Sequence, residues 1–311
     1  MELRGLGRYR LVAPLAIASD CEFYLARHED EPEQGPPSYL AKVLKPQRGP
    51  DAVRRRGQFD HEVKLLKSFN HPCIPTLHAA GEQDGVPYLV VDRVDGITLS
   101  EFLGHDKGEP TAISKELAVY IMGQLADALR HIHTLEYLEE EEPTPLDVVH
   151  RDLNPANIMV SRRGDAVLLD FGKARSQWLP AAHDDPMAGD LAYMAPERLA
   201  PGGQADFKTD LFSMAVTLWE ALRGERCFAG EDDAATRDAI ERFDISQSGR
   251  RVTGLSTKLS EIVRKNLDRD PARRYSGAYQ MLQRLAQSPE AQSAEDSRAK
   301  LAELVTQRAG S

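Results

Sequence analysis

Residues 150–157 read HRDLNPAN, and this stretch decides how the rest of the chain is interpreted. It places an acid, Asp152, and an amide, Asn157, five residues apart, with Pro155 between them. Proline fixes its own backbone angle and restricts the residue before it, which indicates a rigid loop. Carboxylate and amide oxygens are hydrogen-bond acceptors and ligands for hard cations such as Mg²⁺. The stretch therefore predicts a chemical site.

The composition bounds the class of protein. The chain has 311 residues, a hydrophobic fraction of 41% and a formal net charge of −10. This length allows one large domain or two modest lobes with an ample core. The acidic balance argues against nucleic-acid binding, which depends on clustered Lys and Arg. The cysteines are odd in number and unpatterned, which fits a reducing compartment better than a disulfide framework or a zinc site.

The sequence favours a cytoplasmic protein. No apolar run approaches the roughly 18 residues that a membrane-spanning helix needs, so no membrane span is expected. The first residues, MELRGLGRYRLVAPLA, contain only a broken apolar stretch, and no small-residue cleavage site follows them. This pattern is not that of a signal peptide.

The hydrophobic pattern changes character along the chain. Between about residues 9 and 94 it favours short strands in RYRLVAPL, EFYLAR, SYLAKVL and PYLVVDRV. One charged segment, VRRRGQFDHEVKLLKSF, interrupts them. Its apolar residues recur every three to four positions, which predicts an amphipathic helix: Phe59, Val63, Leu66 and Phe69.

From about residue 97 the pattern is helical. In SKELAVYIMGQLADALRHIHTL one face is apolar, formed by Leu117, Ile121, Leu125, Ala128 and Ile132. The segment DLFSMAVTLWEAL is apolar almost all round, so it is expected inside the molecule. The predicted fold class is α+β, with a small β-rich N-lobe (about 9–94) that holds one helix. A connector near 92–97 leads to a larger α-rich C-lobe (about 97–287).

Three segments stand outside this pattern. Two look like insertions, HEDEPEQGPPS (28–38) and LEEEEPTPLD (138–147), and each is expected to be a solvated loop or a docking site for a basic partner. The tail, 288–311, is polar and rich in alanine. Either a frayed helix or disorder is expected there, the helix being built on Leu301, Leu304 and Val305.

Further motifs occur in a fixed order around HRDLNPAN, and together they resemble the eukaryotic-type (Hanks-type) Ser/Thr protein kinases over about residues 9–287. The motifs are Lys42 in YLAKVL, Glu62 in DHEVKLLKSFNHPCI, Asp170 in LLDFGKA, Glu197 in MAPE, Asp210 in DLFSMA and Arg274 in DPARRYS. The resemblance implies a two-lobed kinase fold and transfer of the γ-phosphate of ATP to Ser or Thr hydroxyls.

The resemblance also implies a role for each residue. Asp152 accepts the proton of the substrate hydroxyl, and Asn154 lies beside it among the catalytic residues. Lys42 contacts the α- and β-phosphates and is aimed by an ion pair with Glu62. Two oxygen ligands hold Mg²⁺, or Mn²⁺ in its place: Asn157 and Asp170.

The remaining implied roles concern adenine and the scaffold. The connector offers backbone groups of Asp92 and Val94 to the adenine ring, and Met159 forms an apolar floor. Within the C-lobe, Glu197 is expected to pair with Arg274. The backbone N–H groups of the catalytic loop are expected to point at Asp210.

The nucleotide-binding stretch departs from the family pattern. The phosphate-covering loop normally contains three glycines, but here the stretch reads AIASDCEF, with Ala16, Ala18 and Cys21 in their places. Side chains exclude most backbone conformations with positive φ, so the loop is expected to bind ATP more weakly or to follow a different path. Two bulky residues, Phe23 and Leu40, replace the small apolar residues of the adenine slot.

The substrate side and its regulation depart as well. Ser/Thr kinases usually carry Lys where Asn154 stands and Thr where Asp190 stands, so Asn154 brings no positive charge and Asp190 brings a second carboxylate. Arg151 is typical of kinases ordered by a phosphate, yet residues 173–190 contain no Thr or Tyr. Asp184 or Asp185 is expected either to pair with Arg151 instead or to be solvated.

Three functions are compatible with these features. The first is an active Ser/Thr kinase that acts on a protein substrate. The second is a pseudokinase, a nucleotide-binding or scaffolding module that engages a regulatory protein, and the altered phosphate loop favours it. The third is a kinase-fold enzyme acting on a small molecule, against which the MAPE and Asp210 motifs argue.

Overall fold

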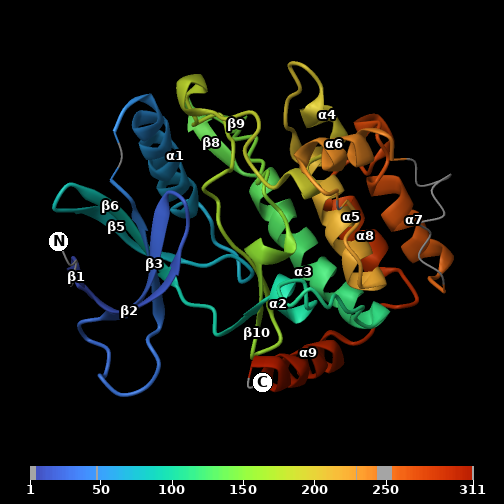
Figure 1. The fold of residues 1–311 in the computed structure, drawn as a ribbon, viewed down its shortest axis with the longest axis horizontal. Coiled ribbons are helices and arrows are strands. Elements are labelled where there is room, and N and C mark those ends of the chain that lie inside the picture. The colour runs from blue at the N-terminus through green and yellow to red at the C-terminus, as the bar shows by residue number, and fades with distance from the viewer. Residues whose placement is uncertain (1–4, 47, 229, 244–253, 310–311) are drawn as a thin grey trace. The chain divides into compact units, whose positions relative to one another are not determined.

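The computed structural model describes residues 5–46, 48–228, 230–243 and 254–309 (Figure 1). These residues form two compact units. The small unit contains the described residues up to Val94 together with Trp178–Asp184. The large unit contains Asp95–Gln177 and the described residues from Asp185 onward. Helical and strand elements are mixed, so the predicted α+β class is confirmed.

The small unit is an antiparallel sheet with one α-helix. Its six strands are ordered β1-β2-β3-β4-β6-β5. They are β1 (Gly5–Leu6), β2 (Tyr9–Ile17), β3 (Cys21–His28), β4 (Tyr39–Leu44), β5 (Leu77–Gln83) and β6 (Val86–Asp92). Helix α1 (Pro50–Leu66) follows β4 and begins with proline, whose fixed backbone angle suits the first helical turn. The predicted strands and helix are thus confirmed, while β1 and β5 were not predicted.

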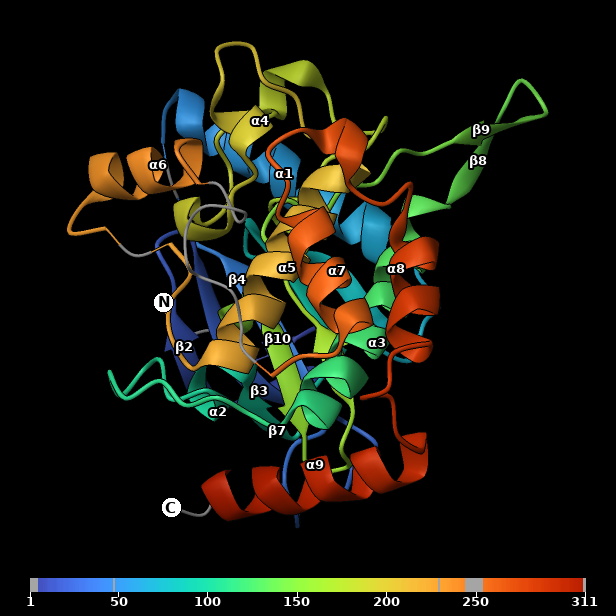
Figure 2. The ribbon, with the colours of Figure 1, turned by 90° about the vertical axis from the view of Figure 1, so that its right-hand side faces the viewer.

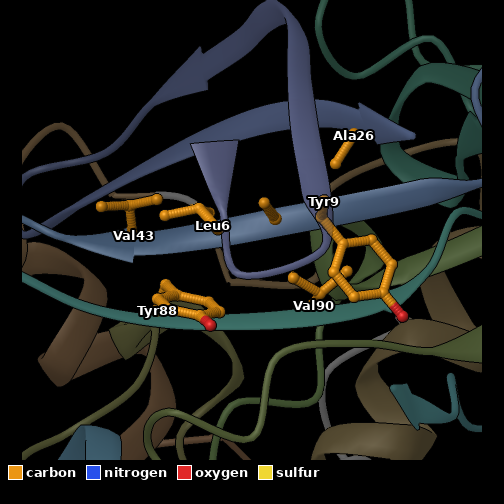
Figure 3. Close-up of a cluster of buried hydrophobic side chains, with 7 residues drawn as sticks. Leu6, Tyr9, Ala26, Val43, Tyr88 and Val90 are labelled. Carbon is orange, nitrogen blue, oxygen red and sulfur yellow. The ribbon is translucent and has the colours of Figure 1, made fainter. Parts of the chain in front are cut away.

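The strand register gives the sheet two different faces. One face is covered by the apolar cluster of Figure 3, in which β1 and the start of β2 lie over the middle strands. The cluster consists of Leu6, Tyr9, Ala26, Ala41, Val43, Tyr88 and Val90. On the opposite face Lys42 lies beside Phe23, and Leu40 lies beside Val91. This second face therefore carries the side chains expected to meet the nucleotide.

The large unit is mainly helical. Its α-helices are α2 (Leu99–Phe102), α3 (Lys115–His133), α4 (Pro196–Leu199), α5 (Phe207–Arg223), α6 (Asp233–Glu241), α7 (Thr257–Asn266), α8 (Ala278–Ala286) and α9 (Ala294–Ala309). Its 3₁₀ helices are η1 (Pro155–Asn157), η3 (Leu191–Tyr193) and η4 (Pro271–Arg273), whereas η2 (Ala181–His183) belongs to the small unit. Its strands are β7 (Gly96–Thr98), β8 (Glu136–Glu139), β9 (Glu142–Pro145), β10 (Ile158–Ser161) and β11 (Ala166–Leu168).

The two predicted helices of the large unit, α3 and α5, have local sequence signals at their ends. Ser114 accepts the backbone N–H of Leu117 at the start of α3. Asp206 caps the start of α5, and Gly224, with φ of 66°, ends it in the left-handed region that favours glycine. Residues 209–222 of α5 are all buried, as their apolar sequence predicted. The predicted apolar face of α3 is buried too.

The predicted scaffold ion pair is present. The Arg274 guanidinium donates to both carboxylate oxygens of Glu197, each at 2.7 Å. The side chain of Arg274 is fully buried, so its charge has no access to water. Removing either partner of such a pair leaves an uncompensated buried charge, which strongly destabilises a fold.

The second acidic segment is not a simple loop. It forms the β8–β9 hairpin, which in Figure 2 projects away from helices α5, α7 and α8. Its turn residues Glu140 and Glu141 both have positive φ, as a tight two-residue hairpin turn requires. In this strand pairing Tyr137 lies opposite Thr144. The sequence did not predict the pairing, because a run of acidic residues is not typical of strands. The first segment, 28–38, folds back on Arg27, whose guanidinium donates to the carbonyls of Pro32 and Gly35.

The tail is helical in the described part. Helix α9 contacts α3, β7 and β10, and in Figure 2 it runs beneath β7 and β10. Leu301 and Val305 are fully buried, whereas Leu304 is only partly covered. Of the two alternatives left by the sequence, the helix is therefore the one found. No helix in the described ranges is long and apolar enough to cross a membrane.

Candidate functional site

The small unit contains a preformed ion pair. The ammonium group of Lys42 on β4 lies 2.8 Å and 3.0 Å from the two carboxylate oxygens of Glu62 on α1. Both side chains are buried, with exposed fractions of 10% for Lys42 and 4% for Glu62. Lys42 also lies above the Phe23 ring, 5.8 Å from its centroid. The pair predicted from the sequence is present and shielded from water.

The altered phosphate-loop stretch forms a tight β-hairpin. The N–H of Ala18 donates to the carbonyl of Cys21 at 2.9 Å, and the Lys45 ammonium donates to the carbonyl of Ala18 at 2.5 Å. Ala16, Ala18 and Cys21 all have negative φ. The turn therefore follows a path that does not require glycine, which is how the substitutions are accommodated.

The connector residues 92–94 differ in how their backbone groups are hydrogen-bonded. The N–H of Asp92 donates to the carbonyl of Thr76 at 3.1 Å, and the N–H of Arg93 donates to Ser38. Within the described residues, no hydrogen bond involves the backbone of Val94. The backbone N–H and C=O of Val94 are therefore not used by any hydrogen bond among the described residues. Phe23 and Leu40 lie on the same sheet face as Lys42 and are partly exposed, as expected for residues that line a slot.

In the large unit, the carboxylate of Asp152 is held by neutral donors. Asn154 Nδ2 donates to Oδ1 at 3.0 Å, and Asn157 Nδ2 donates to Oδ2 at 3.0 Å. The backbone N–H of Asp190 donates to Oδ1 at 2.9 Å. Burial raises the pKa of Asp152; the neighbouring His150 and the Asp190 amide act in the opposite direction, and the Asp170 charge raises it further. The three predicted catalytic-loop residues are thus brought together.

Asp190 does not point its carboxylate at Asp152. Its Oδ1 accepts the N–H of Ala192 and begins η3. Only its backbone N–H contacts Asp152. Asn154 has a similar local role, because its Oδ1 accepts the N–H groups of Ala156 and Asn157 at the start of η1. Asn154 and Asp190, which stand where Ser/Thr kinases usually have Lys and Thr, therefore cap the short helices η1 and η3.

Asn157 and Asp170 provide a donor set that fits a hard cation. The amide nitrogen of Asn157 is used by Asp152, and within the described residues its Oδ1 has no hydrogen-bond partner. Asp170 has a φ of 56°, a strained conformation for a non-glycine residue that is common at functional sites. Two oxygen ligands with waters completing the shell match the chemistry of Mg²⁺. Met159 follows on β10.

The buried Asp210 holds the start of the HRDLNPAN loop by hydrogen bonds. Its carboxylate accepts the backbone N–H groups of His150 at 2.8 Å and Arg151 at 2.9 Å, as predicted. It also contacts His133 Nε2 at 2.8 Å, a partner that sequence reasoning missed. Burial alone would raise the pKa of Asp210, but the hydrogen bonds and the nearby histidines outweigh it and lower the pKa.

Arg198 is a second residue that sequence reasoning missed. Its buried guanidinium donates to the carbonyls of Arg151, Pro186 and Ala188, at 3.1, 2.9 and 2.6 Å. It therefore ties the segment after Asp185 to the catalytic loop. The feature of the sequence that could have indicated this residue is its place directly after the glutamate of MAPE. Arg151 itself donates to the backbone carbonyls of Lys173 and Asp185, so the proposed pairing with an aspartate side chain stays a prediction.

A comparison with models of protein families shows to which family the chain belongs. A family model described as the protein kinase domain matches residues 37–286. This chain belongs to the protein kinase domain family. The matched range of the kinase domain begins after the altered phosphate loop, whose glycines this chain lacks.

Two bacterial relatives illustrate the likeness of this kinase domain. It is 29% identical over 287 residues to the serine/threonine-protein kinase PknB of Mycobacterium tuberculosis, covering 88% of this chain and 42% of that protein. It is 28% identical over 225 residues to the serine/threonine-protein kinase PrkC of Bacillus subtilis, covering 72% of this chain and 32% of that protein. The chain thus spans less than half the length of these curated relatives.

Proposed function

We propose that this kinase domain transfers the γ-phosphate of ATP to Ser or Thr hydroxyls of a protein substrate, with Mg²⁺ or Mn²⁺ as the metal. The observation that carries the proposal is the buried Lys42–Glu62 ion pair at 2.8 Å. Protein kinases transfer phosphate only when this pair is formed. The names of the relatives, both serine/threonine-protein kinases, support the choice of hydroxyl.

Each residue has a role that follows from its surroundings. Asp152 accepts the hydroxyl proton, because its carboxylate is fixed by amide donors rather than neutralised by a cation. Lys42 binds the α- and β-phosphates as a point charge, and Glu62 aims it. Asn157 and Asp170 hold the metal ion, which neutralises charge on the phosphates. The kinase domain is proposed to run from about residue 9 to 287.

The nucleotide contacts are weaker than in most kinases. The N–H of Ala18 is used within the hairpin, so one fewer backbone donor remains for phosphate. Asn154 supplies no charge to the transferred group. Val94 and the carbonyl of Asp92 are proposed to bind the adenine ring, and Phe23, Leu40 and Met159 are proposed to offer it apolar contacts. A high KM for ATP is the expected consequence.

The test measures phosphorylation of a basic Ser/Thr protein at several ATP concentrations. Lys42→Met should reduce kcat/KM by about 10²-fold or more, because it removes charge stabilisation of the phosphates. The matched control is Lys67→Met, which removes an exposed lysine just after α1 and should leave the rate unchanged.

A thermal-shift measurement separates the alternatives. Mg²⁺-ATP at 100 times its dissociation constant should stabilise the native protein by about 2.7 kcal/mol. Stabilisation without phosphate transfer would favour a pseudokinase. Transfer to a small molecule but to no protein hydroxyl would favour a kinase-fold enzyme that acts on a small molecule.

A further inference from the structure

A short segment after Asp170 packs with the small unit although the chain on both sides of it belongs to the large unit. The chain leaves the large unit at Gln177 and rejoins it at Asp185. Within this segment, η2 contacts helix α1, beside which it lies in Figure 1. We call Trp178–Asp184 the α1 brace.

The brace touches α1 at two points on one side of the helix. The Lys64 ammonium lies 4.0 Å from the centroid of the Trp178 ring, within the range of a cation–π contact. The His183 imidazole lies directly against Gly57, where a Cβ atom would overlap the ring. Gly57 and Lys64 are seven residues apart, which is about two helical turns, so both face the same side.

Gly57 itself indicates that this contact matters. Glycine in a helix interior costs about 1 kcal/mol relative to alanine. Position 57 has an ordinary helical backbone and needs no glycine for its own conformation. The close approach of His183 is therefore the structural reason for a small residue here.

The contact bears on Glu62, which lies between the two points of the brace on the same helix. Glu62 reaches Lys42 only when α1 has the right rotation and depth, because its side chain is buried with an exposed fraction of 4%. Two contacts two turns apart resist both rotation and sliding of α1. The brace therefore acts on the residue that aims Lys42.

The brace is held without a phosphate group. Residues 173–190 offer Ser176 as their single hydroxyl, and Ser176 is buried, with an exposed fraction of 5%. The contacts of Trp178 with Lys64 and of His183 with Gly57 involve no phosphate, whereas phosphate–arginine pairs order such segments in other proteins.

We propose that Trp178 and His183 are positioning residues, which hold α1 so that Glu62 pairs with Lys42 without phosphorylation of the segment. The proposal rests on the proposed function of that ion pair. It makes the brace a constitutive replacement for a phosphorylation switch.

A size exchange at the contact tests the brace. Gly57→Ala should displace His183 and lower kcat by about tenfold or more, because small displacements of catalytic groups have large effects on rate. His183→Ala should also lower kcat. In the double variant the new methyl group fills part of the space left by the imidazole, so kcat should exceed that of either single variant.

The controls separate positioning from stability. Gly123→Ala is the matched control, because Gly123 is also inside a helix and a Cβ there meets nothing within 4 Å. It should leave kcat unchanged. Trp178→Phe keeps an aromatic ring and should retain more activity than Trp178→Ala. Because a size exchange restores packing as well as position, kcat is compared only between variants that are folded.

Hydrogen exchange of α1 gives a readout that does not depend on activity. Amides of residues 58–66 should exchange faster in Gly57→Ala and Trp178→Ala, while those of α3 stay unchanged. Unaltered exchange and unaltered kcat in both variants would overturn the proposal. An inactive wild-type protein would refute the proposed function instead, and the exchange of α1 would still judge the brace.

Discussion

At the scale of single residues, the carboxylate of Asp152 is held by hydrogen bonds from neutral groups. Asp152 accepts from Asn154, Asn157 and the amide of Asp190. The residue types at these positions were readable in the sequence. The directions of their side chains could not be read there, because the turn at Asp190 decides that its backbone N–H and not its carboxylate faces Asp152. Side-chain direction depends on backbone angles that a motif does not contain.

Tyr275 offers a residue-scale prediction about stability. It is buried, with an exposed fraction of 1%, and its hydroxyl has no hydrogen-bond partner in the described part of the chain. Burial raises the pKa of this hydroxyl to about 12. Tyr275→Phe removes an unsatisfied polar group and should raise the free energy of unfolding by up to about 1 kcal/mol. Urea unfolding measures this, and a loss of more than 1 kcal/mol would contradict it.

Asp210 offers a prediction about pH. Its folded pKa lies below the ordinary value of 3.8, so its stabilisation is present above that value and is lost as pH falls through the folded pKa. Asp210→Asn should cost about 3 kcal/mol near pH 7, since it disrupts a buried charged network. The cost should stay constant down to about pH 5 and shrink below pH 4.

Urea unfolding of both proteins at each pH measures that cost. The control is Asp233→Asn, on an exposed position of α6. A cost that grows on acidification would mean that the sign assigned to Asp210 is wrong.

At the scale of elements, hydrophobic periodicity predicted α1 and α3, and an almost wholly apolar segment predicted α5, while weaker patterns left other elements open or unpredicted. Helix α9 buries only two large apolar residues fully, Leu301 and Val305, so its sequence left disorder open. The β8–β9 hairpin is paired by its backbone, which a run of glutamates does not reveal. The α1 brace joins residues more than 100 positions apart, and no local pattern reports such a contact.

Helix α9 can be tested by a matched pair of substitutions. Leu301→Ala removes a fully buried side chain and should lower the free energy of unfolding by about 2–4 kcal/mol. Leu304→Ala, one turn along on the partly covered side, should cost about 1 kcal/mol or less. Equal effects in thermal or urea unfolding would show that α9 does not pack as described.

At the scale of the whole molecule, the order of motifs predicted more than any single residue. Lys42, Glu62, Asp152, Asp170, Glu197, Asp210 and Arg274 occur in the order of the protein kinase family. The family model matches most of the chain, and the pairs Lys42–Glu62 and Glu197–Arg274 are formed. What the order could not predict is the path of the β2–β3 turn, which needs no glycine at Ala16, Ala18 or Cys21, and the contacts of Trp178 and His183 with α1.

The most direct measurement is incorporation of phosphate from γ-labelled ATP with Mg²⁺, into the protein itself and into a basic Ser/Thr protein. The wild-type protein is compared with Asp152→Asn, which keeps the shape of the side chain but cannot accept the proton. We predict label on Ser or Thr with the wild type and a loss of about 10²-fold or more in the variant. Equal labelling by both, or none from a folded wild-type protein, would contradict the assignment of Asp152 as the base of an active kinase.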